Sequence, residues 1–205
     1  MDWKRIHYLS GITLSIFIGL HLANHAISVL GEEAHLKTMA FLRHLYRNRI
    51  AETFLLLAVV VQITSGLRLF FSKRKDVNGL FDKLQIWTGL YLAFFLLVHV
   101  SAILFGRLVL HLDTNLYFGA AGINTFPFSL FFIPYYSFAI MAVWGHIAAV
   151  HRKKMTVRVF GLSPQVQAKL LLYTGLILAV LILYGLTNHF TGMTIPEEYN
   201  VLVGK

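Results

Sequence analysis

The fold is decided by the stretch IHYLSGITLSIFIGLHLANHAISVL, residues 6–30, which contains no Asp, Glu, Lys or Arg. A helix of roughly 20 apolar residues, rising about 1.5 Å per residue, crosses the hydrocarbon core of a membrane. The stretch contains three histidines, His7 near its start and His21 and His25 further along, and ionisable side chains at membrane depth are costly and tend to mark function. The stretch therefore predicts a transmembrane helix that carries chemistry.

The remainder of the chain has the same apolar character. Of its 205 residues, 57% are hydrophobic and 13% are charged, and the mean hydropathy is +0.67. Such a composition indicates a membrane protein. Five segments are long and apolar enough to span a bilayer, at about residues 6–30, 51–71, 84–105, 128–149 and 169–187. We predict an all-α integral membrane protein, a bundle of five transmembrane helices that forms one domain over residues 1–205.

The basic residues predict the orientation of this bundle. A net charge of +9 would suggest a nucleic-acid ligand in a soluble protein, but these residues lie in short loops beside apolar spans, so we expect no nucleic acid. Cytoplasmic loops carry an excess of Lys and Arg, and twelve of the 18 fall on the side of the N-terminus. The N-terminus is therefore expected in the cytoplasm, and the protein in a bacterial inner membrane.

The histidines at matching depth are the first candidates for a cofactor site. The sequence contains no Cys, which excludes iron–sulfur clusters and covalently attached haem within this chain. Ile6 and Leu84 mark the inner ends of the first and third predicted helices. His21 lies fifteen residues beyond Ile6, and His99 lies fifteen residues beyond Leu84. Both are thus about 22 Å from the inner boundary. Equal depth on two helices suits the axial ligands of a b-type haem. The alternative is a simple interhelical hydrogen bond.

Further histidines on the outer side leave three roles open. His25 lies one helical turn beyond His21 on the same face. It would contact a haem, join a metal site or bond a neighbouring helix. The other histidines expected near this side are His35, His44, His111 and His189.

The inner half of the bundle offers a less complete pair. His146 on the fourth predicted helix finds no histidine on the second, where Gln62 stands at a similar depth. Glutamine is a poor haem ligand, but its amide hydrogen-bonds well to an imidazole or to a quinone carbonyl. The pair therefore indicates either an incomplete haem site or a quinone site.

Short motifs along the chain resemble those of one known family. They are KRIHYLSG (4–11), GLHL (19–22), RIAETF (49–54), SGLRLFF (65–71), LQIWTG (84–89), LLVH (96–99), WGH (144–146) and SPQ (163–165). In this order, from about Lys4 to Leu186, the chain resembles the five-helix cytochrome b subunit of succinate:quinone oxidoreductases and fumarate reductases, in the form with one polypeptide and two haems.

The resemblance implies specific ligands and partners. The outer haem of the family would be held by His21 and His99. The inner haem takes one histidine from the fourth helix, which falls on His146, and one from the second, which falls on Gln62. Since that ligand is replaced, we expect one haem b, with the second in doubt. The resemblance also implies flavoprotein and iron–sulfur subunits on the cytoplasmic side.

We therefore expect a membrane-anchor, haem b-binding, quinone-reactive subunit of a succinate dehydrogenase or fumarate reductase in a respiratory chain. Glu52 is a candidate proton acceptor for quinol, or else a first-turn residue that stabilises its helix. His7 and Ser10 are other candidate quinone contacts. One alternative is a stand-alone membrane cytochrome b that oxidises quinol without dehydrogenase partners. Another is a haem-free metal-binding or transport descendant of the fold.

Overall fold

The computed structural model describes residues 2–75 and 77–205, and within them five helices are long and apolar enough to cross a membrane. The predicted all-α, five-helix membrane fold is confirmed. Polar residues lengthen each helix past at least one end of the apolar segment that predicts it, whereas the first helix ends at Ile27, three residues before the end of its predicted segment. The five helices are α1 (Trp3–Ile27), α3 (Arg49–Lys73), α4 (Leu80–Leu108), α6 (Ser129–Lys154) and α7 (Pro164–Leu186).

Side chains define where several of these helices begin. The Asp2 carboxylate accepts from the first backbone N–H groups of α1, and the Asn48 amide oxygen accepts from the backbone of Ala51 at 3.0 Å. Ser163 caps α7, with Pro164 in the first turn. These are the residue types that satisfy the free N–H groups of a helix start.

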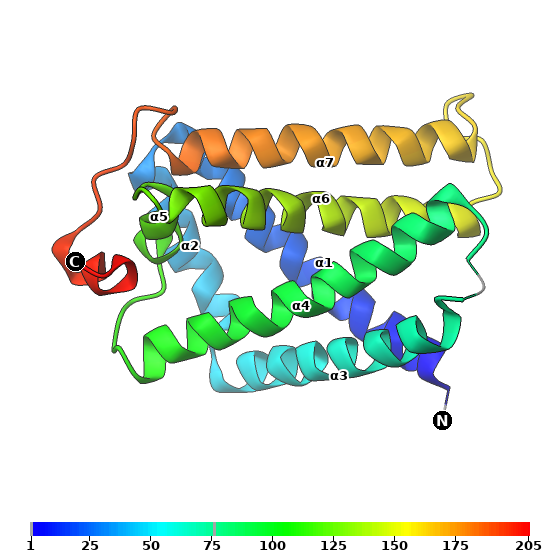
Figure 1. The fold of residues 1–205 in the computed structure, drawn as a ribbon, viewed down its shortest axis with the longest axis horizontal. Coiled ribbons are helices and arrows are strands. Elements are labelled where there is room, and N and C mark those ends of the chain that lie inside the picture. Colours follow the sequence, from blue (N-terminus) through cyan, green and yellow to red (C-terminus); the bar gives the residue numbers. More distant parts are fainter. Residues whose placement is uncertain (1, 76) are drawn as a thin grey trace.

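The five long helices enclose a central space. In Figure 1, α3, α4, α6 and α7 lie side by side and α1 crosses behind them. Packing runs from α1 to α3, α4, α6 and α7, and α7 returns to α1. Among the described residues, α1 and α4 do not pack directly on each other. The space between these two helices is where a ligand can fit.

Three shorter elements, which the apolar segments of the sequence did not predict, close one end of the bundle. They are α2 (Glu32–Tyr46), α5 (Leu116–Ile123) and the 3₁₀ helix η2 (Glu197–Val203). We call them the cap. In η2, the fully buried Tyr199 donates from its hydroxyl to the Asp113 carbonyl at 2.9 Å. The C-terminal segment is thereby fixed to the loop before α5.

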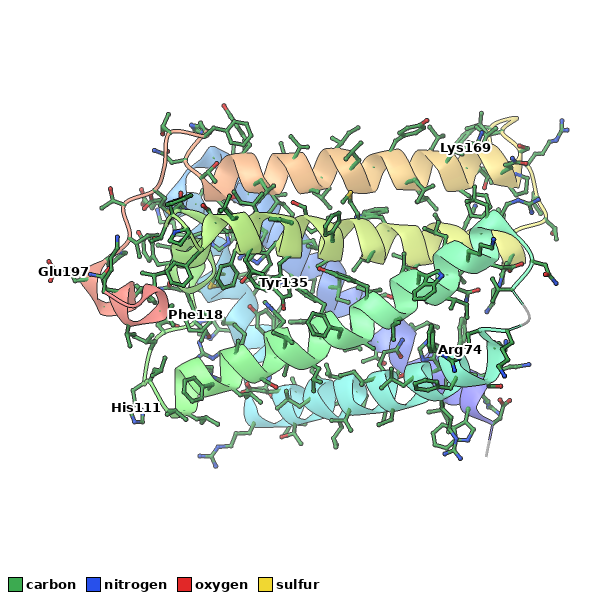
Figure 2. The ribbon with its side chains drawn as sticks, in the orientation of Figure 1. Arg74, His111, Phe118, Tyr135, Lys169 and Glu197 are labelled. Carbon is green, nitrogen blue, oxygen red and sulfur yellow. The ribbon has the colours of Figure 1, made fainter. Side chains whose placement is uncertain are left out.

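The opposite end, which we call the basic end, holds the N-terminus and the α3–α4 and α6–α7 connections. Figure 2 shows His111 and Glu197 at the cap, and Arg74 and Lys169 at the basic end. The cap end balances six basic residues against six acidic ones, so the net charge of +9 falls at the basic end. The acidic residues are Glu32, Glu33, Glu52, Asp113, Glu197 and Glu198, and the basic ones are Lys37, Arg43, Arg47, Arg49, Arg107 and Lys205.

Candidate functional site

A cavity of about 1360 Å³ occupies the space between the long helices. It runs from Asp82 and Lys153 at the basic end to Arg43 and Arg47 beneath the cap. Small-molecule sites usually measure about 300–1,000 Å³. The cavity is therefore large enough for a bulky cofactor together with a second ligand.

His21 and His99 line the part of this cavity nearer the cap. Their ring centres are 6.2 Å apart and their ring planes meet at 66°. Phe17 stacks on His21 at 5.6 Å and 19°, and Phe95 stacks on His99 at 5.0 Å and 13°. Each phenylalanine lies four residues before its histidine and so shares its helix face. Two equivalent Phe–His pairs thus restrict both imidazoles. The repeated spacing is visible in the sequence, although the depth argument for the two histidines made no use of it.

The spacing of these rings suits a metal held between them. Metal–nitrogen bonds of about 2.0–2.1 Å on both sides of one ion would place two imidazole centres roughly 6.4 Å apart. The observed 6.2 Å is close to this value. Among residues 2–75 and 77–205, no group of three or more His, Asp or Glu side chains is arranged to hold a metal ion. A metal bound here would need further ligands from outside the protein, and a porphyrin supplies four.

His25 and His35 extend this pair into a histidine cluster, defined as His21, His25, His35 and His99. The Nε2 atoms of His25 and His21 are 3.2 Å apart, and His25 Nδ1 is 3.3 Å from His35 Nε2. A metal on His21 Nε2 would replace the contact with His25. His25 is therefore the ring that must turn aside, or become a ligand itself.

His35 enters the cluster from the cap. Its side chain is fully buried in α2, and its Nε2 also contacts the Asn24 amide at 3.2 Å. Burial, with smaller contributions from His21 and Arg43, lowers the pKa of His35 to about 4. The ring is thus neutral near pH 7 and keeps a lone pair on one nitrogen, as metal binding or hydrogen-bond acceptance requires.

Three of the outer histidines do not join the cluster. His44, His111 and His189 are exposed, and His189 donates from Nε2 to the Val29 carbonyl at 3.1 Å. His44 follows His35 by nine residues on the same helix, which places it on the opposite face. Of the outer histidines, the structure therefore brings only His25 and His35 close to His21.

Gln62 at the basic end contacts His7 and Ser10 and makes no hydrogen bond with His146 in the part of the chain that the structure describes. Its amide nitrogen donates to His7 Nε2 at 3.3 Å, and its amide oxygen accepts from Ser10 Oγ at 2.5 Å. His7 Nδ1 is 3.0 Å from Ser65 Oγ. Both candidate quinone contacts thus meet Gln62 in one hydrogen-bonded group.

His146 lines the same cavity from α6. Its Nδ1 donates to the Gln85 carbonyl at 3.1 Å and lies 3.3 Å from Thr88 Oγ1. A Cβ atom on Gly89 would lie 3.2 Å from the His146 ring, so the glycine leaves room for it. With the ring proton on Nδ1, His146 Nε2 keeps a lone pair for a metal or for a donor on a ligand.

Glu52 forms an ion pair at the other end of the cavity. It lies in the first turn of α3, and the Arg107 guanidinium donates to both of its carboxylate oxygens. An arginine near a helix end commonly extends toward the membrane surface, but Arg107 pairs with Glu52 instead. A guanidinium stabilises the charged form of a carboxylate, so the geometry favours a structural role for Glu52.

The fold and the site together define a class: a five-helix integral membrane protein with a histidine cluster inside its bundle. Comparisons with protein-family models, with curated proteins and with solved structures find no match for this chain. The geometry of the cavity and the motif resemblance are therefore the basis for assigning a function.

Proposed function

We propose that this protein binds one haem b between His21 and His99 and exchanges electrons between that haem and a membrane quinone. The observation that carries the proposal is the pair of imidazoles, 6.2 Å apart on α1 and α4. When bound, the haem would supply one-electron redox chemistry. The chain's own contribution is to hold the two rings, which Phe17 and Phe95 orient, and to exclude water from them.

The basic end of the cavity supplies groups suited to a quinone headgroup. A quinone carbonyl accepts hydrogen bonds and a quinol hydroxyl donates them. The Gln62 amide has a second N–H besides the one that His7 accepts, and His146 Nε2 has a free lone pair. His7 and Ser10 would position Gln62, and His146 would accept a quinol proton. The apolar cavity wall between the two ends suits the quinone tail.

The proposed setting is a membrane anchor for flavoprotein and iron–sulfur subunits of a succinate dehydrogenase or fumarate reductase. Support comes from the motif resemblance and from the excess of positive charge at the basic end, where such subunits would dock. Positive-inside topology alone would also produce this charge. Purification in mild detergent separates this setting from a stand-alone quinol-oxidising cytochrome, because an anchor retains flavin and iron–sulfur chains.

The difference spectrum of the purified protein tests the proposed function. Reduction with dithionite is expected to shift a Soret band and produce the α-band of a six-coordinate haem b, at one haem per chain. Absence of that band in protein expressed with ample haem would refute both the anchor and the stand-alone cytochrome and would favour a haem-free descendant. Oxidation of the reduced haem by a short-chain quinone then tests the quinone site.

A further inference from the structure

Two arginines of the cap line the central cavity and share a single acidic partner. Arg43 Nη2 lies 2.9 Å from Asp113 Oδ1, its Nη1 donates to Asp113 Oδ2 at 3.1 Å, and Arg47 Nη1 lies 3.6 Å from Oδ1. The side chains of Arg43 and Arg47 are only 20% and 31% exposed. The third arginine that lines the cavity at this end, Arg107, is already paired with Glu52. Within residues 2–75 and 77–205, one positive charge at the mouth of an apolar cavity is therefore left without a carboxylate.

The helix that carries these arginines also carries the buried histidine of the cluster. His35, Met39 and Arg43 recur every four residues along one side of α2, and Arg47, four residues further on, is the C-cap residue of this helix. Met39, Arg43 and Arg47 line the cavity. Near Arg43, the Tyr46 ring packs edge-on against Phe17 at 5.1 Å, and Phe17 stacks on His21. The cap thus places its unmatched charge next to the ring system of the histidine pair.

Depth decides which end of the cavity would receive the charged edge of a ligand held by His21. His21 lies six residues before the end of α1 and eighteen after its start. At about 1.5 Å per residue, the cap boundary is roughly 9 Å away and the basic boundary roughly 27 Å away. At the basic end, moreover, Lys153 is occupied by Asp82 at 2.6 Å and by the Gln85 side chain at 2.6 Å.

We propose that Arg43 and Arg47 form a carboxylate-binding site that receives the acidic side chains of the tetrapyrrole held by His21 and His99. This inference rests on the proposed haem function. Guanidinium groups bind carboxylates in paired, charge-assisted hydrogen bonds, which are stronger where water is scarce. Asp113 shares the site and keeps the arginines in place when no ligand is bound.

The test compares haem b with its dimethyl ester, which has the same iron and ring but no carboxylates. Full-length protein freed of haem is titrated with each in detergent, and dissociation constants are read from the Soret band. We expect the free acid to bind about tenfold more tightly than the ester, and Arg43→Gln combined with Arg47→Gln to remove most of this preference. Lys37→Gln, on the exposed side of the same helix, should preserve it.

A second variant makes the test independent of cap folding. Asp113→Asn leaves both arginines in place without their carboxylate, so the preference for the free acid should increase. Arg43→Gln should also lower the midpoint potential of the bound haem, because loss of a nearby cation stabilises the ferric state.

Equal binding of acid and ester by the unmodified protein, or an unchanged preference in Asp113→Asn, would overturn the carboxylate site and leave the haem function intact. If neither haem b nor its dimethyl ester gave a bis-imidazole spectrum, the proposed function itself would be refuted.

Discussion

The two ends of the central cavity both hold imidazoles, but the imidazoles are used differently. Beneath the cap, the His21 and His99 rings lie 6.2 Å apart, and each is stacked on a phenylalanine one turn earlier. At the basic end, His7 contacts an amide and a hydroxyl, and His146 contacts a backbone carbonyl. The first arrangement brings two imidazoles together, with a third, His25, against His21 Nε2, whereas the second fixes each ring separately.

The difference shows that the role open to a histidine inside a membrane bundle depends on which of its ring nitrogens already have hydrogen-bond partners. His7 is satisfied at both nitrogens by Gln62 and Ser65, so it has no lone pair to offer. His146 is satisfied at Nδ1 only and lacks a facing imidazole. The cap-side pair is therefore the candidate haem site, and the basic-end group is better suited to hydrogen-bonding a ligand.

Removal of either imidazole of the cap-side pair should leave both ends of the cavity without a haem site. His21→Ala and His99→Ala should each reduce the haem content from one per chain to none, because a six-coordinate haem loses an axial ligand in either variant. Pyridine haemochrome assay against protein concentration measures this. His44→Ala, on the exposed face of α2, is the control. Full haem content in His21→Ala or His99→Ala would disprove the pairing. If His25→Ala lost the haem and His21→Ala retained it, the axial ligand on α1 would be His25 instead of His21.

A single substitution can give the basic end a second candidate haem ligand. Gln62→His should raise the haem content from one per chain toward two, because it places a second imidazole in the cavity that His146 already lines. The same haemochrome ratio reports the result, with Gln62→Leu as the control for a simple change of polarity. A ratio that stays at one would mean that side chains have filled the space between α3 and α6.

Acid should weaken the cap side through His35. Its folded-state pKa of about 4 lies below the usual 6.5, so the unfolded chain binds the proton more readily and stability falls as the pH drops from 6.5 toward 4. The shift corresponds to about 3 kcal/mol at most. Thermal unfolding of haem-free protein in detergent at several pH values measures it. His35→Asn should flatten the profile, whereas His44→Asn should not. Equal slopes for the two variants would contradict the assignment.

The smallest expected effect concerns Glu52. If its carboxylate only holds Arg107, Glu52→Gln should lower the free energy of unfolding by about 1 kcal/mol and leave haem reduction by quinol nearly unchanged. Arg107→Gln should cause a similar loss, since it breaks the same pair. Stopped-flow measurement of the rate of haem reduction by quinol distinguishes the two roles of Glu52. A large drop in this rate in Glu52→Gln but not in Arg107→Gln would restore the proton-acceptor hypothesis.

The long helices were predictable because a membrane span needs a single property, sustained apolarity, that the sequence displays directly. Counting residues from helix ends also placed His21 and His99 at one depth, and their ring centres lie 6.2 Å apart. That inference worked because helix rise is constant, so position in the chain converts into depth.

The cap and the contacts of Gln62 were not predictable in the same way. In α2, His35 is buried and His44 is exposed, but nothing in that segment says which face meets the bundle until its packing is known. Likewise, Gln62 and His146 share a depth without sharing a contact, because depth leaves the rotation of each helix about its axis undetermined. The role of Arg43 could not be predicted because it depends on Asp113, which is 70 positions away in the chain.

The attachment of Tyr199 has a consequence for the order of biogenesis. The cap lies over the end of the cavity nearer the histidine pair, and the element that fastens it, η2, spans Glu197–Val203 and emerges from the ribosome after all five long helices. The contact that fixes the loop containing Asp113, the partner of Arg43, therefore forms only after all five long helices have been synthesised.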